Sequence, residues 1–327
     1  MKKISPKLAG KLFLERLIIA YFTARNWKPL WLNVLNRKPR NLYLSDLPAL
    51  NDTQKNIVAE LRATGIAVSH LSELFPQENW LLKLQEYSKN IIDSRTDEAK
   101  HKAKSFLEPL WPDDPDIDFN NPFLQLTFRP EIGKIINSYL DMYTKFYYFT
   151  LNITKAVEEG AAAQISQKWH RDPEDRKMCK IFIYLNDVDE GTGPFTYVTR
   201  STYGLKYGKF FPQRPPRGVY PKPGELESKI NANDIKVCTA KAGTVIFADT
   251  AGLHKGGYAT KKDRLMFTAG FRSSASPWKF HFNYPKDFDE QVRKQNLTPA
   301  ARYALKVRYP KISTLILYGG LKKLFNK

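Results

Sequence analysis

Two histidines and one aspartate have the residue types and surroundings of metal ligands. His170 and Asp172 form an H-x-D pair in the segment W-H-R-D. On an extended segment, residues i and i+2 point to the same side, so this imidazole and this carboxylate can reach one ion. His254 follows the apolar segment Thr244–Phe247 and stands in a glycine-rich turn. Two imidazoles and one carboxylate on one side of an octahedral metal form the facial triad of non-haem Fe(II) oxygenases.

An arginine close to the second histidine suits a dicarboxylate cosubstrate. Arg264 lies ten residues after His254, at the start of an apolar segment. From a strand at that place, its planar guanidinium can clamp the distal carboxylate of 2-oxoglutarate. An H-x-D pair alone occurs often by chance. Its combination with the later His254 and with Arg264 is far more specific, and predicts Fe(II) with 2-oxoglutarate as cosubstrate.

Short strands from residue 145 onward must position these side chains. Apolar segments alternate with glycine turns there, which is typical of strands. The predicted strands are 146–153, 166–170, 178–185, 194–198, 236–240, 244–247 and 264–272. Helices are expected over 51–63, 79–92 and 131–140, the first between the cap signal at Asn51 and the stop at Gly65. The pattern predicts a mainly β protein with flanking helices (α+β).

Residues 145–275 resemble the phytanoyl-CoA dioxygenase family of Fe(II)/2-oxoglutarate-dependent oxygenases. The similar segments are Lys168–Asp172, Ile183–Pro194 and Gly243–Phe247, followed by His254 and Arg264. Segment 60–68 also resembles the helix–glycine–strand element with which that family begins. The resemblance implies a double-stranded β-helix core (a cupin-like jelly roll) with iron at its mouth, and places the ligands at His170, Asp172 and His254. It also implies hydroxylation of a C–H bond, which consumes O2 and releases succinate and CO2.

The resemblance implies further contacts with the cosubstrate, beyond the anchor at Arg264. It places Phe182, Asn152 and Thr154 near 2-oxoglutarate, although packing in the core explains these three residues equally well. The presence of Asp172 favours hydroxylation, because related halogenases lack this carboxylate. The family's Pro-Gly-Ser-His turn is replaced by Thr199–Thr202. This departure makes the family a poor guide to the substrate.

The oxygenase domain is predicted over residues 51–290, with an insertion at 205–234. The insertion is rich in Pro, Gly, Tyr, Lys and Arg. Loops of this length are uncommon unless they serve a function or lack order. We interpret it as a lid whose Lys206, Arg214 and Arg217 recognise an anionic group of a lipid, glycolipid or other small molecule. A solvated surface loop is the alternative.

The composition is that of a folded protein with two basic ends. Of the 327 residues, 42 % are apolar and 26 % are charged, and the formal net charge is +19. Residues 1–40 carry +9 and residues 301–327 carry +7, which leaves +3 for the rest. Both segments mix Lys and Arg with Leu and aromatic residues, as interfacial helices do. They fit a helical N-terminal segment (1–50) and a helical C-terminal segment (291–327).

The basic ends have two interpretations that the sequence leaves open. They pack on the domain as ordinary helices, or they contact an anionic membrane through 1–40 and 301–327. No apolar run is long enough to span a bilayer, and the N-terminus makes a poor signal peptide. We therefore expect a cytoplasmic protein, peripheral at the inner face of the membrane in the second case. Cys179 and Cys238 are expected to be buried thiols.

A non-catalytic jelly-roll module that binds anionic membrane or nucleic acid is the alternative function. It would not need His170, Asp172 or His254. Nucleic acid ranks lower as a partner because the sequence has no recognisable nucleic-acid-binding motif. The sequence does not indicate an oligomeric state.

Overall fold

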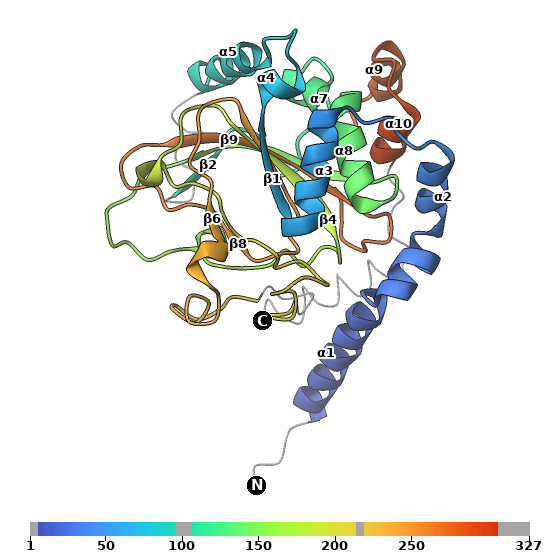
Figure 1. The fold of residues 1–327 in the computed structure, drawn as a ribbon, viewed down its shortest axis with the longest axis vertical. Helices are drawn as coiled ribbons and strands as arrows, with labels where there is room; N and C mark the ends of the chain where they lie inside the picture. The colour runs from blue at the N-terminus through green and yellow to red at the C-terminus, as the bar shows by residue number, and fades with distance from the viewer. Residues whose placement is uncertain (1–5, 96–105, 214–218, 307–327) are drawn as a thin grey trace.

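A computed structural model describes residues 6–95, 106–213 and 219–306, and its strands form two antiparallel sheets (Figure 1). The larger sheet has the order β1-β7-β4-β9-β3-β2, with β1 (Ile66–His70), β2 (Leu107–Pro109), β3 (Lys145–Thr154), β4 (Met178–Tyr184), β7 (Thr244–Ala248) and β9 (Arg264–Arg272). The smaller sheet has the order β6-β5-β8, with β5 (Thr196–Val198), β6 (Ile235–Val237) and β8 (His254–Lys255).

Helices cover the outer face of the larger sheet, where α3 and α8 lie against it in Figure 1. The helices are α1 (Pro6–Arg25), α2 (Arg37–Ser45), α3 (Asp52–Thr64), α4 (Leu71–Leu74), α5 (Trp80–Asp93), α7 (Pro122–Thr127), α8 (Pro130–Leu140), α9 (Phe288–Lys294) and α10 (Pro299–Leu305). The helix expected over 51–63 is present as α3. Asn51 and Gln54 form its capping box, and Gly65 ends it with a φ of 86°. The left-handed conformation there favours glycine.

Successive side chains along a strand point to opposite faces of the sheet, and this alternation divides the apolar side chains between two cores. On β4, Cys179, Ile181 and Ile183 belong to the large apolar core beneath the helices. The intervening Phe182 and Tyr184 pack with Tyr197 of β5 in a second core between the sheets. Side chains on this inner face therefore lie between the two sheets. Both cysteines are buried, as expected.

The pairing of β9 with β3 and β4 brings the candidate residues to the inner face. The observed strand Arg264–Arg272 coincides with the predicted one. Its Leu265 and Phe267 pack toward the helices, so Arg264 points to the opposite, inner face. Thr154 of β3 pairs directly with Arg264 in the ladder. The jelly-roll interior therefore receives Arg264 and its neighbour from two adjacent strands.

The predicted strand at 166–170 is wrong. Residues Ile165–Gln167 form a short 3₁₀ helix, and only His170 makes an isolated bridge, to His254. The Ile165 backbone has a φ of 38°, which breaks the extended run. Backbone hydrogen bonds nevertheless hold the H-x-D segment in place at both His170 and Asp172. His170 and His254 exchange two backbone hydrogen bonds of 2.9 Å, and the Asp172 amide donates to Thr250.

Helix α1 extends away from the body of the molecule (Figure 1). At its C-terminal end, Ile18 and Phe22 are buried and pack against Trp278. Phe13, Leu17 and Tyr21 remain exposed, by 65 %, 51 % and 43 %. The helix thus packs on the domain through one side and leaves apolar side chains uncovered on another. Within the described residues, no helix combines the length and apolarity needed to cross a membrane.

Candidate metal centre

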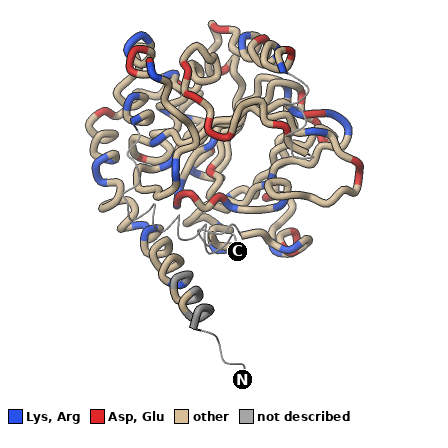
Figure 2. Tube along the Cα trace, turned by 180° about the vertical axis from the view of Figure 1, so that it is seen from behind, with Lys and Arg blue, Asp and Glu red and all other residues tan. Residues whose placement is uncertain are grey.

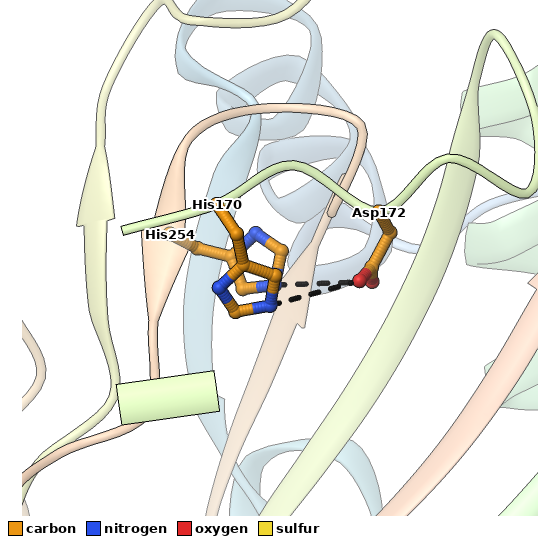
Figure 3. A group of neighbouring side chains, drawn as sticks. All are labelled: His170, Asp172 and His254. Carbon is orange, nitrogen blue, oxygen red and sulfur yellow. Dashed lines mark ion pairs between the residues drawn. The ribbon is translucent and has the colours of Figure 1, made fainter. Parts of the chain in front are cut away.

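His170, Asp172 and His254 meet at one point between the sheets (Figure 3). One ligand atom from each residue lies within 4.8 Å of the others. The Nε2 atoms of His170 and His254 each lie 3.8 Å from a carboxylate oxygen of Asp172. The three side chains are 13 %, 11 % and 6 % exposed in the order 170, 172, 254. These atoms are close enough to bind one cation.

Hydrogen bonds fix both imidazoles in the form that a metal requires. Nδ1 of His170 lies 2.8 Å from the carbonyl of Lys168, and Nδ1 of His254 lies 3.0 Å from that of Gly252. A carbonyl oxygen only accepts, so each Nδ1 carries the proton. Each Nε2 therefore presents its lone pair toward Asp172. Backbone acceptors commonly set ring orientation in this way at metal centres.

Lys180 is a buried cation beside the carboxylate. It lies on β4, and its Nζ is 2.5 Å from Oδ2 of Asp172. Burial alone would raise the pKa of Asp172, but the Lys180 ammonium and both imidazoles bring it well below its ordinary value. The carboxylate is therefore charged at neutral pH. The sequence analysis missed Lys180. A lysine that alternates with Phe182 and Tyr184 on an apolar strand was the available signal.

Burial also decides the charge of His254. It lowers the pKa of His254 to about 3, and the neighbouring His170 adds to the effect. An unfolded histidine titrates near 6.5. Between these values the unfolded chain holds a proton that the folded chain does not. Stability should therefore rise with pH through this window and decline as the pH falls toward 3.

We predict that acidification from pH 6.5 to 4.5 destabilises the metal-free protein partly through His254. One proton contributes up to about 1.4 kcal/mol per pH unit. Urea unfolding at several pH values measures the slope, and the variant His254→Gln should show a slope smaller by up to one proton. Equal slopes in the two proteins would contradict the assignment.

Arg264 is buried near the other end of the inner face. Its Nη1 donates to the carbonyl of Gly193, and its Nη2 donates to Oγ1 of Thr154 at 3.1 Å. Its Nε has no hydrogen-bond partner among the described residues. A guanidinium has five N–H donors, and Gly193, Thr154 and Tyr184 take up to three of them, so the others remain for a ligand. The side chain is 3 % exposed, which makes unused donors costly unless an anion binds there.

The other predicted cosubstrate residues lie on the same face. Thr154 contacts Arg264 directly, as described. Oδ1 of Asn152 accepts a 3.0 Å hydrogen bond from Thr150, so its amide nitrogen is the group left for a ligand. The ring of Phe182 packs 4.5 Å from that of Phe195, which in turn lies 5.7 Å from His254. Phe182 therefore packs in the core between the sheets as well as facing the interior.

Arg171, between His170 and Asp172, fastens the insertion to the H-x-D segment. Its guanidinium donates to the carbonyls of Tyr207, Phe210 and Phe211 in the insertion. Its Nη1 also donates to the backbone carbonyls of Ser201 and Ala251, at 2.5 and 2.6 Å. Residues 207–211 of the insertion are thus held against the H-x-D segment. Tyr220 of the insertion stacks on the His170 ring, with 5.9 Å between the two ring centres. The sequence analysis did not predict this contact.

Replacing Arg171 with lysine should loosen this attachment. A lysine keeps the charge but cannot bond five carbonyls at once. We expect cleavage by trypsin within 205–234 to become at least several-fold faster than in the wild type, while the jelly-roll core stays resistant. The comparison variant is Arg62→Lys, whose arginine is half exposed on α3. Unchanged cleavage in Arg171→Lys would show that the segment is held by other contacts.

Of the three predicted substrate residues, the structure describes only Lys206. Lys206 lies 3.0 Å from Asp234 and over the ring of Tyr207, so its charge already has an internal partner. Arg214 and Arg217 lie outside the described residues. Recognition of an anionic group by these side chains stays a prediction.

The fold is shared with non-haem oxygenase structures, although neither a protein-family model nor a curated protein matches the sequence. The chain is similar to the epimerase SnoN in complex with Fe3+, alpha ketoglutarate and nogalamycin RO. The identity is 14 %, the alignment covers 69 % of this chain and 86 % of that one, and the TM-score is 0.51. A second SnoN structure gives a TM-score of 0.50 at 14 % identity, covering 68 % and 84 % of the two chains. This chain and SnoN share the jelly-roll fold.

The expected fold class is thereby confirmed. At 14 % identity, the likeness supports the broader fold group and leaves the narrower resemblance to phytanoyl-CoA dioxygenases as a prediction.

The donor set fits Fe(II). Imidazole nitrogens and a carboxylate are ligands that iron accepts, and the triad leaves coordination positions open. The lone pairs on both Nε2 atoms and the charged state of Asp172 meet the requirement that ligands be deprotonated. The residues that would hold the metal are therefore His170, Asp172 and His254.

Proposed function

We propose that this chain is an Fe(II)/2-oxoglutarate-dependent dioxygenase that hydroxylates a C–H bond of a small-molecule substrate. The observation that carries the proposal is the shared inner face of the triad and of Arg264, which is buried with unused donors. SnoN, which has this fold, was crystallised with iron and alpha ketoglutarate, and this supports the same cofactors here. When bound, iron would supply the oxidation of 2-oxoglutarate by O2 and the transfer of oxygen to the substrate.

The chain's own residues bind and orient in this proposal. His170, Asp172 and His254 hold the metal, with the imidazoles fixed by backbone carbonyls. Arg264 binds the far carboxylate of 2-oxoglutarate through its free N–H groups. The insertion, fastened by Arg171, covers the H-x-D segment and limits access of water.

Anaerobic titration tests the proposal and separates it from a non-catalytic module. We expect one Fe(II) per chain, metal-dependent binding of 2-oxoglutarate by calorimetry, and slow succinate formation when O2 is admitted. His170→Ala should lose all three. A protein that binds neither ligand but keeps its fold would reject the oxygenase and favour the alternative.

We propose further that α1 brings the enzyme to the anionic inner face of a membrane, where a glycolipid, one of the predicted substrate classes, would be found. The exposed Phe13, Leu17 and Tyr21 continue to Trp27, which is 65 % exposed. Figure 2 shows α1 projecting from the body of the molecule, and residues 1–40 carry +9 overall. This pairing of apolar area and positive charge suits anionic lipid. Residues 307–327 of the predicted C-terminal contact lie outside the described residues.

Liposome flotation tests this contact with two matched variants. Leu17 on α1 and Leu44 on α2 are 51 % and 52 % exposed. Leu17→Glu should reduce binding to phosphatidylglycerol vesicles several-fold, and Leu44→Glu, with the same change of charge, should not. Equal binding of both variants, or no preference for anionic over neutral vesicles, would reject the proposal.

A further inference from the structure

A β-bulge in β3 directs two consecutive tyrosines to the inner face. The register with β9 shifts between Phe146 and Tyr148, which leaves Tyr147 as the extra residue. Bulges often redirect side chains beside active sites. Gly270, opposite on β9, makes room for both rings. A Cβ at Gly270 would lie 2.5 Å from the Tyr147 ring and 2.7 Å from the Tyr148 ring.

This tyrosine pair adjoins the metal ligands through Lys180. Lys180 also pairs with Gly270, on the other side of β9. Its Nζ lies 5.0 Å from the ring centre of Tyr148 and 2.5 Å from Asp172. The guanidinium of Arg272 lies 4.5 Å from the ring centre of Tyr147. The bulge thus places phenol groups beside two cations and one ligand carboxylate.

Three polar atoms of this cluster have no hydrogen-bond partner among the described residues. They are Oη of Tyr147, Nη1 of Arg272 and Oε2 of Glu174, which follows Asp172 by two residues. Tyr147 is 2 % exposed and Arg272 is 1 % exposed. A buried polar group without a partner costs about 1–3 kcal/mol, so a folded protein rarely keeps three together without a use.

The cluster lies at the opposite end of the inner face from Arg264. Gly270 follows Arg264 by six residues on β9, a span of roughly 20 Å along a strand. Asp172 lies toward the Gly270 end of β9, because it contacts Lys180 and Lys180 pairs with Gly270. Arg264 and the cluster therefore lie toward opposite ends of the inner face, so a 2-oxoglutarate held by Arg264 would leave the end with the cluster to another ligand.

We propose that Tyr147, Glu174 and Arg272 bind a pair of hydroxyl groups on an uncharged, carbohydrate-like substrate. This inference rests on the proposed oxygenase function and names the chemistry of the group held nearest the metal. Oε2 of Glu174 accepts a hydrogen bond, or donates one when the carboxyl group is protonated. Nη1 of Arg272 donates, and Oη of Tyr147 can do both. Two neighbouring hydroxyls, each able to donate and accept, match that set.

Charge and polarity separate this substrate class from the alternatives. The cations Lys180 and Arg272 are balanced by the carboxyl groups of Asp172 and Glu174, so the cluster has no formal excess charge for an anion. An alkyl chain placed there would leave the three free atoms buried without partners. The predicted anion recognition by the insertion concerns a different part of the chain.

Saturation-transfer NMR on protein loaded with Zn(II) and 2-oxoglutarate tests the inference, with methyl glucoside and myo-inositol as probes and octanoate as the comparison. We expect at least one polyol to bind and octanoate not to bind. Tyr147→Phe and Glu174→Gln should each weaken polyol binding at least tenfold. Because the Tyr147 hydroxyl has no partner, Tyr147→Phe should not lower the melting temperature.

The matched control is Tyr139→Phe. The Tyr139 hydroxyl is buried and donates to Asp249 at 2.7 Å, so this variant should melt at a lower temperature and keep polyol binding. The inference is overturned if neither polyol binds, if binding survives Tyr147→Phe, or if Tyr147→Phe melts as low as the control. Calorimetry on the same samples keeps the two proposals apart. Normal binding of Zn(II) and 2-oxoglutarate without polyol binding rejects the substrate class alone, and failure to bind either cofactor rejects the oxygenase.

Discussion

Asp172→Ala is expected to abolish metal binding and to destabilise the metal-free protein by about 3–5 kcal/mol, the usual consequence of removing one partner of a buried ion pair. The Lys180 ammonium lies 2.5 Å from Asp172 and is only 11 % exposed. Without the carboxylate, a buried cation remains beside the two imidazoles. It has lost its closest carboxylate partner, and it also repels an incoming metal ion. Urea unfolding and Fe(II) titration measure the two effects.

A second substitution isolates the cause of the instability. Asp172→Ala combined with Lys180→Met should recover much of the lost unfolding free energy without recovering metal binding. The comparison pair is Arg62 and Asp141. Both side chains are about half exposed, and Nη2 of Arg62 lies 2.6 Å from Oδ1 of Asp141. Asp141→Ala should change stability by less than about 1 kcal/mol, as surface pairs do. Asp172→Ala with wild-type stability would show that Lys180 finds another partner.

Replacing Arg264 should give the second large effect, a loss of 2-oxoglutarate affinity on the order of 100-fold or more with Fe(II) binding retained. Each hydrogen bond between charged groups contributes about 1.5–3 kcal/mol, and a forked carboxylate contact makes two of them. Arg264→Gln removes the charge and the fork, whereas Arg264→Lys keeps the charge alone. We expect an intermediate affinity for the lysine variant. Calorimetry with Fe(II) under anaerobic conditions gives both binding constants.

Folding must be checked in the same variants, because Arg264 also donates to Gly193 and Thr154. Thr154→Val removes one of these contacts and leaves the guanidinium in place. It should affect 2-oxoglutarate binding less than Arg264→Lys does. Equal cosubstrate affinity in the wild type and both arginine variants would place the 2-oxoglutarate site elsewhere.

Local sequence signals were sufficient where one element alone decides the structure. The cap at Asn51 and the glycine at position 65 bounded α3, and the apolar run 264–272 was a strand along its whole length. The H-x-D spacing and the glycine turn are local features, and they pointed to His170, Asp172 and His254, which the structure brings together. The role of Arg264 as the 2-oxoglutarate anchor stays a prediction.

The missed features depend on pairing between distant segments. The strand expected at 166–170 gave way to a 3₁₀ turn, since His170 pairs with a single residue of the distant β8 segment. Lys180 contacts Asp172 because the fold places β4 beside the H-x-D segment, a contact that the sequence of the strand alone does not show. The bulge at Tyr147 is a register shift between β3 and β9, and neither strand shows it alone. The ion pair between Lys206 and Asp234 also joins two distant residues, and the sequence analysis did not predict it.

The backbone bridge between His170 and His254 has a consequence for the order of assembly. The two residues are 84 positions apart in the chain, so this contact forms only after a long loop closes. In an unfolded chain the H-x-D pair is a short chelate, and His254 is not held near it. Iron loading should therefore follow folding, slowing the rate at which the native state opens while leaving the rate of collapse unchanged.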